Sequence, residues 1–365
     1  MATNESKFFR IFIVIISIVC FLSIFTFKPI IDGDGLSYVE AIKVLQGESA
    51  PVNFVPNRIL TTFLGLDSVI LFSKIFGSIE AGWLVLNILF YFILNIVFYK
   101  LILLVFKSEK TAFLASLFLA TNYAMISFGL DYWMDIGGWL FYVLALYFSL
   151  KYLQTSEKES LLYSALSVGV GGLFKEYAFL GIIPMAVILI YENWPHSIMI
   201  IKKSFVPALF ALVPILVVYI FVYEKFDYTY ATWFSFNTGY ASQYYFYFSK
   251  IIEYIKSFGS LYNFLAFLVI GGAYYFIRNQ RKLVSEKKTQ VFILSVILST
   301  LPIFTWPGIT QRILFITVPA MIIVASFLFK KFEKQWWIFL PLLVLYIVAN
   351  FTMDAFILPN FNLPF

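Results

Sequence analysis

Long runs of apolar residues constrain this chain more than any other feature. The first runs from Phe8 to Phe27, between Lys7 and Lys28, and has the length of about 20 residues that a helix needs to cross a bilayer. It lacks a small-residue cleavage site, so we expect it to stay as an anchor. Ten further candidate spans follow, at 81–106, 111–128, 136–153, 160–174, 177–192, 201–222, 261–278, 290–306, 310–329 and 336–353. We therefore predict an all-α polytopic membrane protein with about eleven transmembrane helices.

The composition excludes several classes of protein. Hydrophobic residues make up 61% of the chain and charged residues 13%, against about 45–50% and about 25% in soluble domains. Eleven spans leave no room for a separate soluble domain, and no dinucleotide or P-loop motif is present, so residues 1–365 are expected to form a single transmembrane domain. We expect no nucleic-acid partner. The single Cys20 and single His196 exclude disulfides within the chain, Cys- or His-based zinc sites and His-centred triads.

The stretch 59–77 is apolar enough to span but carries Asp67 and Lys74. Its apolar residues recur at helical spacing around a polar stripe, so we predict an amphipathic helix on the membrane surface. With this choice and a cytoplasmic N-terminus, 17 of the 26 Lys and Arg residues fall inside, as the positive-inside rule requires. The predicted topology is N-in and C-out in the cell membrane, with extracytoplasmic loops at 28–80 and 223–260. Because all seven Asp residues fall outside or at an outer helix end, the active site is expected there.

Two carboxylates follow the first span directly, in the sequence Asp32-Gly33-Asp34-Gly35. The glycines allow a sharp turn, and a short helix is predicted from about Leu36, with its N-terminus toward the acids. One interpretation is an ordinary helix cap, and the other is a catalytic or ligand-binding role.

The sequence Asp34-Gly-Leu-Ser-Tyr38-Val-Glu-Ala41-Ile resembles the motif of the GT-C glycosyltransferases, which include protein O-mannosyltransferases and aminoarabinose transferases. In that class an acidic motif after the first span precedes a Tyr and an amphipathic helix, and a second surface helix follows an Arg, here Arg58. The topology predicted above is also similar. The usual second acid is replaced by Gly35, so either Asp32 or Asp34 could be the essential carboxylate, and the spacing to Tyr38 favours Asp34.

The resemblance implies transfer of a sugar from a polyprenyl-phosphate donor to an acceptor hydroxyl on the extracytoplasmic face, with inversion and an Asp general base. The acceptor could be a glycan, a lipid or a protein. The leaving phosphate needs cationic partners. The candidates are Lys175, beside Glu176 between two short spans, Arg312 at the start of a late span, and Arg58. The alternative for Lys175 is an ion pair with Glu176 that only neutralises both charges, and the alternative for Arg312 is an anchor at the membrane interface.

Asp131 and Asp135 lie at the outer end of the span 136–153 and could orient the acceptor or join Asp34 in a divalent-metal site; they could equally be dipole-favoured helix acids. We do not assign a metal. Trp233 represents an aromatic-rich second loop that could stack on a sugar or belong to the interfacial aromatic belt. The alternative functions are a flippase or transporter of lipid-linked glycans and a glycan polymerase. Charges at the outer helix ends, without a mid-membrane array, favour the transferase.

Overall fold

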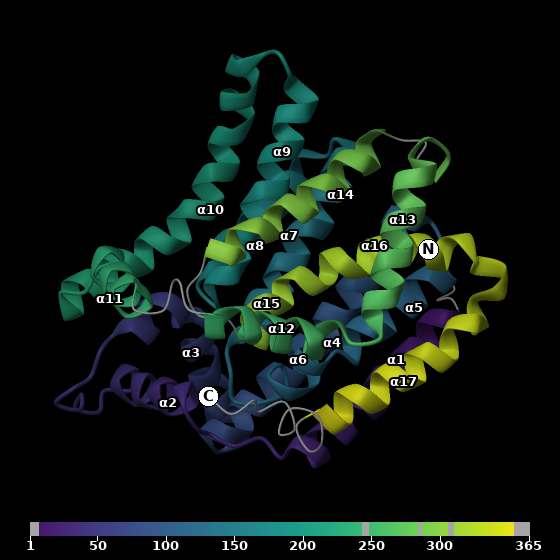
Figure 1. Ribbon diagram of the computed structural model, residues 1–365. Helices are drawn as coiled ribbons and strands as arrows, with labels where there is room; N and C mark the ends of the chain where they lie inside the picture. Colours follow the sequence, from purple (N-terminus) through teal and green to yellow (C-terminus); the bar gives the residue numbers. More distant parts are fainter. Residues whose placement is uncertain (1–6, 243–247, 284–286, 306–309, 354–365) are drawn as a thin grey trace.

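The computed structural model describes residues 7–242, 248–283, 287–305 and 310–353, and within these ranges it is helical with no strand. The first half contains α1 (Lys7–Phe27), α2 (Asp34–Leu45), α3 (Asn57–Phe76), α4 (Ile79–Phe106), α5 (Glu109–Ala120), α6 (Tyr123–Ser127), α7 (Asp135–Thr155), α8 (Lys158–Gly172), η1 (Glu176–Gly181) and α9 (Ile182–Asn193). The second half contains α10 (Ser197–Phe226), α11 (Tyr230–Ser242), α12 (Phe248–Tyr262), α13 (Leu265–Leu283), α14 (Lys287–Thr300), η2 (Leu301–Thr305), α15 (Gln311–Leu314), η3 (Phe315–Thr317), α16 (Val318–Lys331), η4 (Glu333–Phe339) and α17 (Leu340–Thr352). Figure 1 shows how these helices pack.

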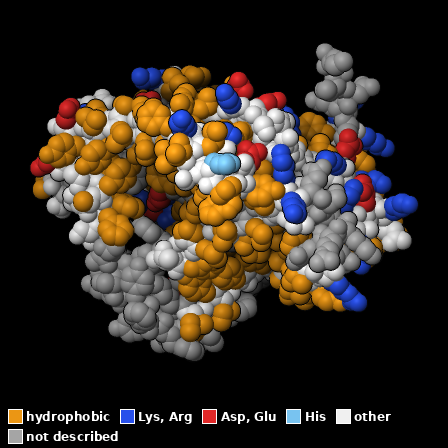
Figure 2. Space-filling model, turned by 90° about the horizontal axis from the view of Figure 1, so that it is seen from above, with side chains coloured by type: hydrophobic (Ala, Val, Ile, Leu, Met, Phe, Trp, Pro, Cys, Tyr) orange, Lys and Arg blue, Asp and Glu red, His pale blue; other side chains and the backbone are white. Residues whose placement is uncertain are grey.

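The protein is an all-α polytopic membrane protein, as predicted. Within the described ranges, nine helices are long and apolar enough to span a bilayer, or ten if the bent pair α12–α13 counts as one. Figure 2 shows hydrophobic side chains over wide areas of one face, with Lys and Arg side chains mainly in its upper and right-hand parts. Residue 306 of the expected span 290–306 and the middle of the loop 223–260, residues 243–247, lie outside the described residues.

The count differs from the expected eleven for identifiable reasons. The expected span 111–128 is broken into α5 and α6, and α8 has only 15 residues, so neither reaches spanning length alone. The expected span 261–278 is α13, which follows α12 after a bend of 86°. In contrast, α3 has a spanning length and composition, although we expected it to lie on the surface.

Buried amide side chains stabilise the interruption between α5 and α6. Asn122 caps α6 by accepting a hydrogen bond from the Ala124 N–H, and it donates to the carbonyl of Leu261 at 2.8 Å. Asn350 of α17 donates to the carbonyl of Thr121 at 2.7 Å. Interruptions of a helix within a bilayer are stable when protein groups satisfy the freed backbone groups, and these amides do so.

The turns expected to be cytoplasmic gather at one end of the molecule. The Ser108 hydroxyl donates to the Glu333 carboxylate at 2.7 Å, and the Lys288 ammonium donates to the carbonyl of Leu153 at 2.7 Å. The Gln154 amide donates a hydrogen bond to the carbonyl of Leu104, and so connects the turn that contains Ser108 to the turn that follows Leu153. Helices α2 and α3 lie at the other end of the molecule, at the lower left of Figure 1.

Helix α3 begins and ends near that second end. Arg58, in its first turn, contacts Asp34. After α3 ends, Trp83 in the first turns of α4 packs edge-on against Tyr38 of α2. The surface position of α3 that the charge distribution suggests stays a prediction. The apolar and polar faces of α3 are less clearly separated than its sequence suggested. Its exposed side chains include Leu71, Ile75 and Phe76 as well as Asp67 and Lys74.

Candidate active site

Six charged side chains from five regions of the chain form one cluster at this end of the molecule. They are Asp34, Arg58, Asp135, Lys175, Glu176 and Arg312. All six were candidates in the sequence, and three are acids and three are bases. The charges are therefore balanced, and because they lie among apolar helices they depend on one another for stabilisation.

Asp34 is the centre of the cluster. Its carboxylate contacts Arg58 at 2.5 Å through one oxygen and Arg312 at 2.8 Å through the other. Burial raises the pKa of Asp34, but Arg58, Arg312 and Lys175 outweigh that effect and bring its pKa below the ordinary value of 3.8. Asp34 is the first residue of α2, and Gly33 before it has φ +45°, a conformation that L side chains rarely adopt.

Arg312 joins two acids. Its guanidinium lies 2.8 Å from Asp34 and 3.4 Å from Asp135, and it stacks on the ring of Trp133 with the guanidinium carbon 4.0 Å from the ring centroid. A planar, forked cation suits this combination of two carboxylates and an aromatic face. The residues that precede it in the sequence, Trp306–Ile309, lie outside the described residues.

Lys175 is deeply buried, with 4% of its surface exposed. Its ammonium donates to the hydroxyl of Tyr38 at 3.1 Å and lies 3.7 Å from Glu176. Burial lowers the pKa of Lys175, but Glu176, Tyr38 and Asp135 outweigh it and raise the pKa above its ordinary value, so the ammonium stays charged. Gly138 of α7 makes room for this residue, because a Cβ at that position would lie 2.5 Å from the Cβ of Lys175.

Tyr38 connects Lys175 to Arg58. It is fully buried, and the Arg58 guanidinium carbon lies 4.8 Å from its ring centroid. Arg58 also donates from Nε to the hydroxyl of Ser37 at 3.0 Å. Tyr38 and Ser37 both belong to α2, so this short helix fixes the acid and holds two of its cationic neighbours.

Asp135 is completely buried at the start of α7. One of its oxygens faces Arg312, and its other oxygen has no hydrogen-bond partner among the described residues. Tyr177, which the sequence analysis did not single out, is buried beside the cluster, with the Lys175 ammonium 6.0 Å from its ring centroid. An acid with a spare acceptor in a buried cluster can receive a hydroxyl proton or hydroxyl hydrogen bond from a bound molecule.

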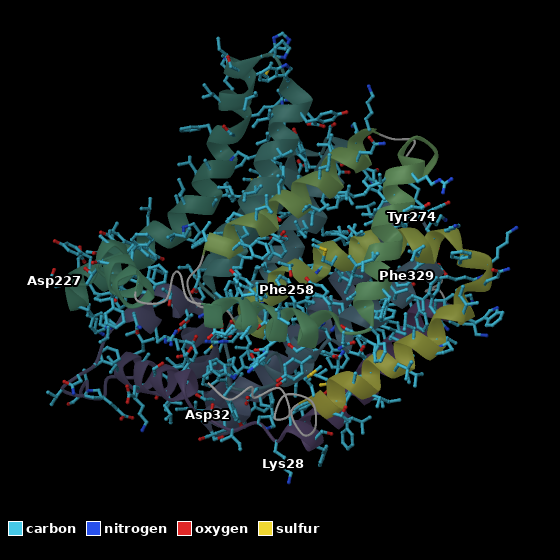
Figure 3. The ribbon with its side chains drawn as sticks, viewed as in Figure 1. Lys28, Asp32, Asp227, Phe258, Tyr274 and Phe329 are labelled. Atoms are coloured by element: carbon cyan, nitrogen blue, oxygen red, sulfur yellow. The ribbon has the colours of Figure 1, made fainter. Side chains whose placement is uncertain are left out.

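Three other candidates lie apart from the cluster. Asp32 is exposed at the turn before α2, and Figure 3 labels it near the lower edge of the view. Asp131 accepts hydrogen bonds from the backbone N–H groups of Ile30 and Tyr132, at 3.2 and 2.7 Å, and so ties the first loop to the segment before α7. Trp233 of α11 is half-buried and packs edge-on against Tyr230.

Sequence reasoning missed Trp133 and Tyr177 as partners of charged residues. Both stand beside residues that it did select, Trp133 between Asp131 and Asp135 and Tyr177 directly after Glu176. Their nearness to charged residues in the sequence was the only available signal. No three His, Cys, Asp or Glu side chains converge as a metal-ligand set in the part of the chain that the structure describes.

Residues 69–223 match the family model of the dolichyl-phosphate-mannose-protein mannosyltransferases. This confirms the GT-C resemblance. The match runs from the middle of α3 to α10 and includes Asp135, Lys175 and Glu176, whereas Asp34, Arg58 and Arg312 lie outside it. No curated protein matches the chain. The family match and the apolar helices together support a multi-pass membrane glycosyltransferase of the GT-C type.

Proposed function

We propose that the protein transfers a sugar from a polyprenyl-phosphate donor to an acceptor hydroxyl on the extracytoplasmic face of the cell membrane, with inversion at the sugar carbon. The observation that carries the proposal is the convergence of Arg58, Lys175 and Arg312 around Asp34. These residues come from distant parts of the sequence, and a phosphate leaving group needs such a concentration of fixed positive charge. The acceptor is a glycan, a lipid or a protein.

In the proposed reaction the acceptor oxygen attacks C1 of the sugar, and the bond from C1 to the phosphate oxygen breaks. The proton of the acceptor hydroxyl passes to Asp34 as general base, and polyprenyl phosphate leaves with the bonding electron pair. Arg312 and Arg58 are well placed to bind the phosphate, because each guanidinium can form a forked contact with oxygens. Asp135, with its spare oxygen, is proposed to orient a sugar or acceptor hydroxyl.

The low pKa of Asp34 is compatible with a base only if its surroundings change during the reaction. A phosphate that draws Arg58 and Arg312 toward itself reduces the positive charge on the carboxylate and raises its proton affinity. Binding of the donor would thus prepare the base. The arginines would therefore both bind the phosphate and control the proton affinity of Asp34, because they contact Asp34 directly.

The proposal is tested by comparing cells that carry the wild-type protein, Asp34→Asn or no protein, with Asp32→Asn as a matched control. Mass spectrometry would measure surface glycans and polyprenyl-phosphate sugars at equal protein abundance. We expect Asp34→Asn to remove one glycan residue and let its lipid-linked donor accumulate, while Asp32→Asn resembles the wild type because Asp32 is exposed and outside the cluster. Wild-type glycans in the Asp34→Asn cells would rule out Asp34 as the base, and loss in Asp32→Asn alone would move that role to Asp32.

A further inference from the structure

A cavity lies on a different side of α3 from the cluster around Asp34. It has a volume of about 580 Å³ and is formed where the end of α2, one face of α3 and the last turns of α10 meet. The lining residues are Leu45, Gln46, Phe63, Asp67, Ile70, Lys74, Phe221 and Lys225. None of them belongs to the cluster around Asp34.

The α3 residues of this cavity form a single stripe along the helix. Phe63, Asp67, Ile70 and Lys74 follow one another at intervals of four, three and four residues, the spacing of one helix face. Arg58 at the start of the same helix faces Asp34 instead. The two sites therefore use different residues of α3, and a ligand of the cavity does not need the proposed catalytic groups.

The polar groups of the cavity are free to bind a ligand. Lys74 and Asp67 are exposed and form no ion pair among the residues that the structure describes. Lys225 lies over the rings of Phe221 and Phe226, with its ammonium 5.6 and 5.4 Å from their centroids, and forms no ion pair in the same ranges. Two ammonium groups suit a phosphate, while Asp67 and the Gln46 carbonyl can accept hydrogen bonds from hydroxyl groups.

One part of the cavity wall is apolar, formed by Leu45, Phe63, Ile70 and Phe221, and it continues onto the exposed side of α10. The rings of Phe63 and Phe221 meet edge-on at 5.6 Å. On the preceding turns of α10, Val213, Leu216 and Val217 are between 47% and 60% exposed. Because α10 is a candidate spanning helix, these side chains offer a path for a hydrocarbon chain within the bilayer.

We propose that this cavity binds an anionic phospholipid of the bilayer, with its phosphodiester at Lys74 and Lys225, a hydroxylated head group at Asp67 and Gln46, and an acyl chain along α10. A sugar-phosphate lipid shares this chemistry. The bilayer phospholipid is favoured because the cavity shares no residue with the cluster proposed to bind the donor. Lipid binding here is independent of sugar transfer and is tested without it.

The test uses the purified full-length protein and native mass spectrometry with added phosphatidylglycerol, phosphatidylcholine or free glycerol 3-phosphate. The variant Lys74→Ala/Lys225→Ala is compared with Lys43→Ala/Lys256→Ala, which removes two lysines that do not line the cavity. We expect the first variant to bind phosphatidylglycerol roughly tenfold more weakly or worse, since each lysine near a lipid phosphate contributes substantially to binding. The control variant Lys43→Ala/Lys256→Ala and the charge-preserving variant Lys74→Arg/Lys225→Arg should bind phosphatidylglycerol about as well as the wild type. Binding of phosphatidylcholine should change little in any variant.

Three results would overturn the proposal. The first is equal loss of phosphatidylglycerol in both double-alanine variants, which would indicate a general charge effect. The second is tight binding of glycerol 3-phosphate without the lipid, which would indicate a site for a free phosphate ester. The third is lysine-dependent binding of polyprenyl-phosphate lipids extracted from the cells in preference to phosphatidylglycerol, which would make the cavity a donor-entry site. Asp67→Ala, which removes the acceptor, should reduce the preference for phosphatidylglycerol over phosphatidic acid, which lacks the head-group hydroxyls.

Discussion

The guanidinium of Arg312 lies 2.8 Å from the carboxylate of Asp34, although 278 residues separate them in the sequence. The same guanidinium contacts Asp135 at 3.4 Å and stacks on Trp133. One side chain thus joins the start of α2, the segment before α7 and the start of α15. The proposed active site depends on the packing of these three regions more than on any local motif.

Replacement of Arg312 is expected to damage both stability and activity. Arg312→Ala leaves the buried Asp135 without its cation, and such a loss costs about 3–5 kcal/mol in the free energy of unfolding. Arg312→Lys keeps the charge but loses the forked contact and the stacking, so we expect folding to survive and activity to fall by roughly tenfold or more. Thermal unfolding in detergent and the glycan profile of cells measure the two effects.

A double substitution separates the two roles of Arg312. Arg312→Gln with Asp135→Asn removes the pair together, so most of the lost stability should return because no buried charge is left alone. Activity should stay low, since the proposed phosphate-binding cation and the acid proposed to orient a hydroxyl are both missing. Activity comparable to the wild type in this variant would exclude Arg312 from phosphate binding.

The depressed pKa of Asp34 makes its contribution to stability dependent on pH. A carboxyl group whose pKa is lower in the folded protein stabilises the fold above its ordinary pKa of 3.8, and this contribution is lost as the pH falls through the folded value. We expect the difference in melting temperature between the wild type and Asp34→Asn to be constant from neutral pH to near pH 4 and to shrink below pH 3.8. A difference that shrinks well above pH 3.8 would show that the pKa is not depressed.

Gly138→Ala is expected to displace Lys175 without removing any charged group from the cluster. Its new Cβ would lie 2.5 Å from the Cβ of Lys175, so the turn between α8 and η1 has to move. Overpacking of this kind costs about 1–3 kcal/mol, and the shift of the ammonium should lower transfer activity by at least roughly tenfold, since misplacement of a catalytic group is costly. Gly259→Ala is the control, because among the described residues its added Cβ meets no atom within 4 Å apart from its chain neighbours and the backbone of its own helix. Equal activity of the two variants would show that the position of Lys175 is not critical.

The sequence was sufficient to predict the membrane class and to select the charged residues that the structure brings together in one cluster. Apolar runs of spanning length identify membrane helices without knowledge of packing. Lys175 stood out because a charge between two short spans is costly unless it has a function or a partner. Asp34 stood out as an acid directly after the first span, and Arg58 and Arg312 through the resemblance to the GT-C class. Their partners could not be predicted, because the contact between Arg312 and Asp34 depends on how α2 and α15 pack.

The helix count was harder to predict for the same reason. The apolar run 111–128 contains Asn122, whose amide finds partners on α12 and α17, and this permits a break that hydropathy does not reveal. Likewise α3 has the composition of a spanning helix, yet both its ends lie near α2. Composition describes a segment alone, whereas its place in the membrane depends on the neighbours that it finds.

Asp131→Asn is expected to be mild, in contrast to Asp131→Ala. The carboxylate holds the backbone N–H groups of Ile30 and Tyr132, and an amide oxygen can accept the same hydrogen bonds. Burial raises the pKa of Asp131, and the two N–H groups offset this only in part, so loss of the charge carries little penalty. We expect Asp131→Ala to lose about 1–3 kcal/mol in the free energy of unfolding, and Asp131→Asn to keep its stability and activity. Inactive but stable Asp131→Asn protein would instead indicate a direct role of the charge in binding the acceptor.

The position of α3 is open to a labelling test. Cys20 is buried in α1, so a Cys20→Ser background allows single cysteines to be introduced at exposed sites. Glu48 lies before α3 and Ser78 after it, and Ser156 lies at the opposite end of the molecule, after α7. If α3 lies on the surface, a membrane-impermeant maleimide applied to intact cells should label Glu48→Cys and Ser78→Cys but not Ser156→Cys. If α3 spans the bilayer, Glu48→Cys and Ser78→Cys will be labelled from opposite sides. The proposed extracytoplasmic site would then need a different topology, because α4 and every later helix would be inverted relative to the first loop.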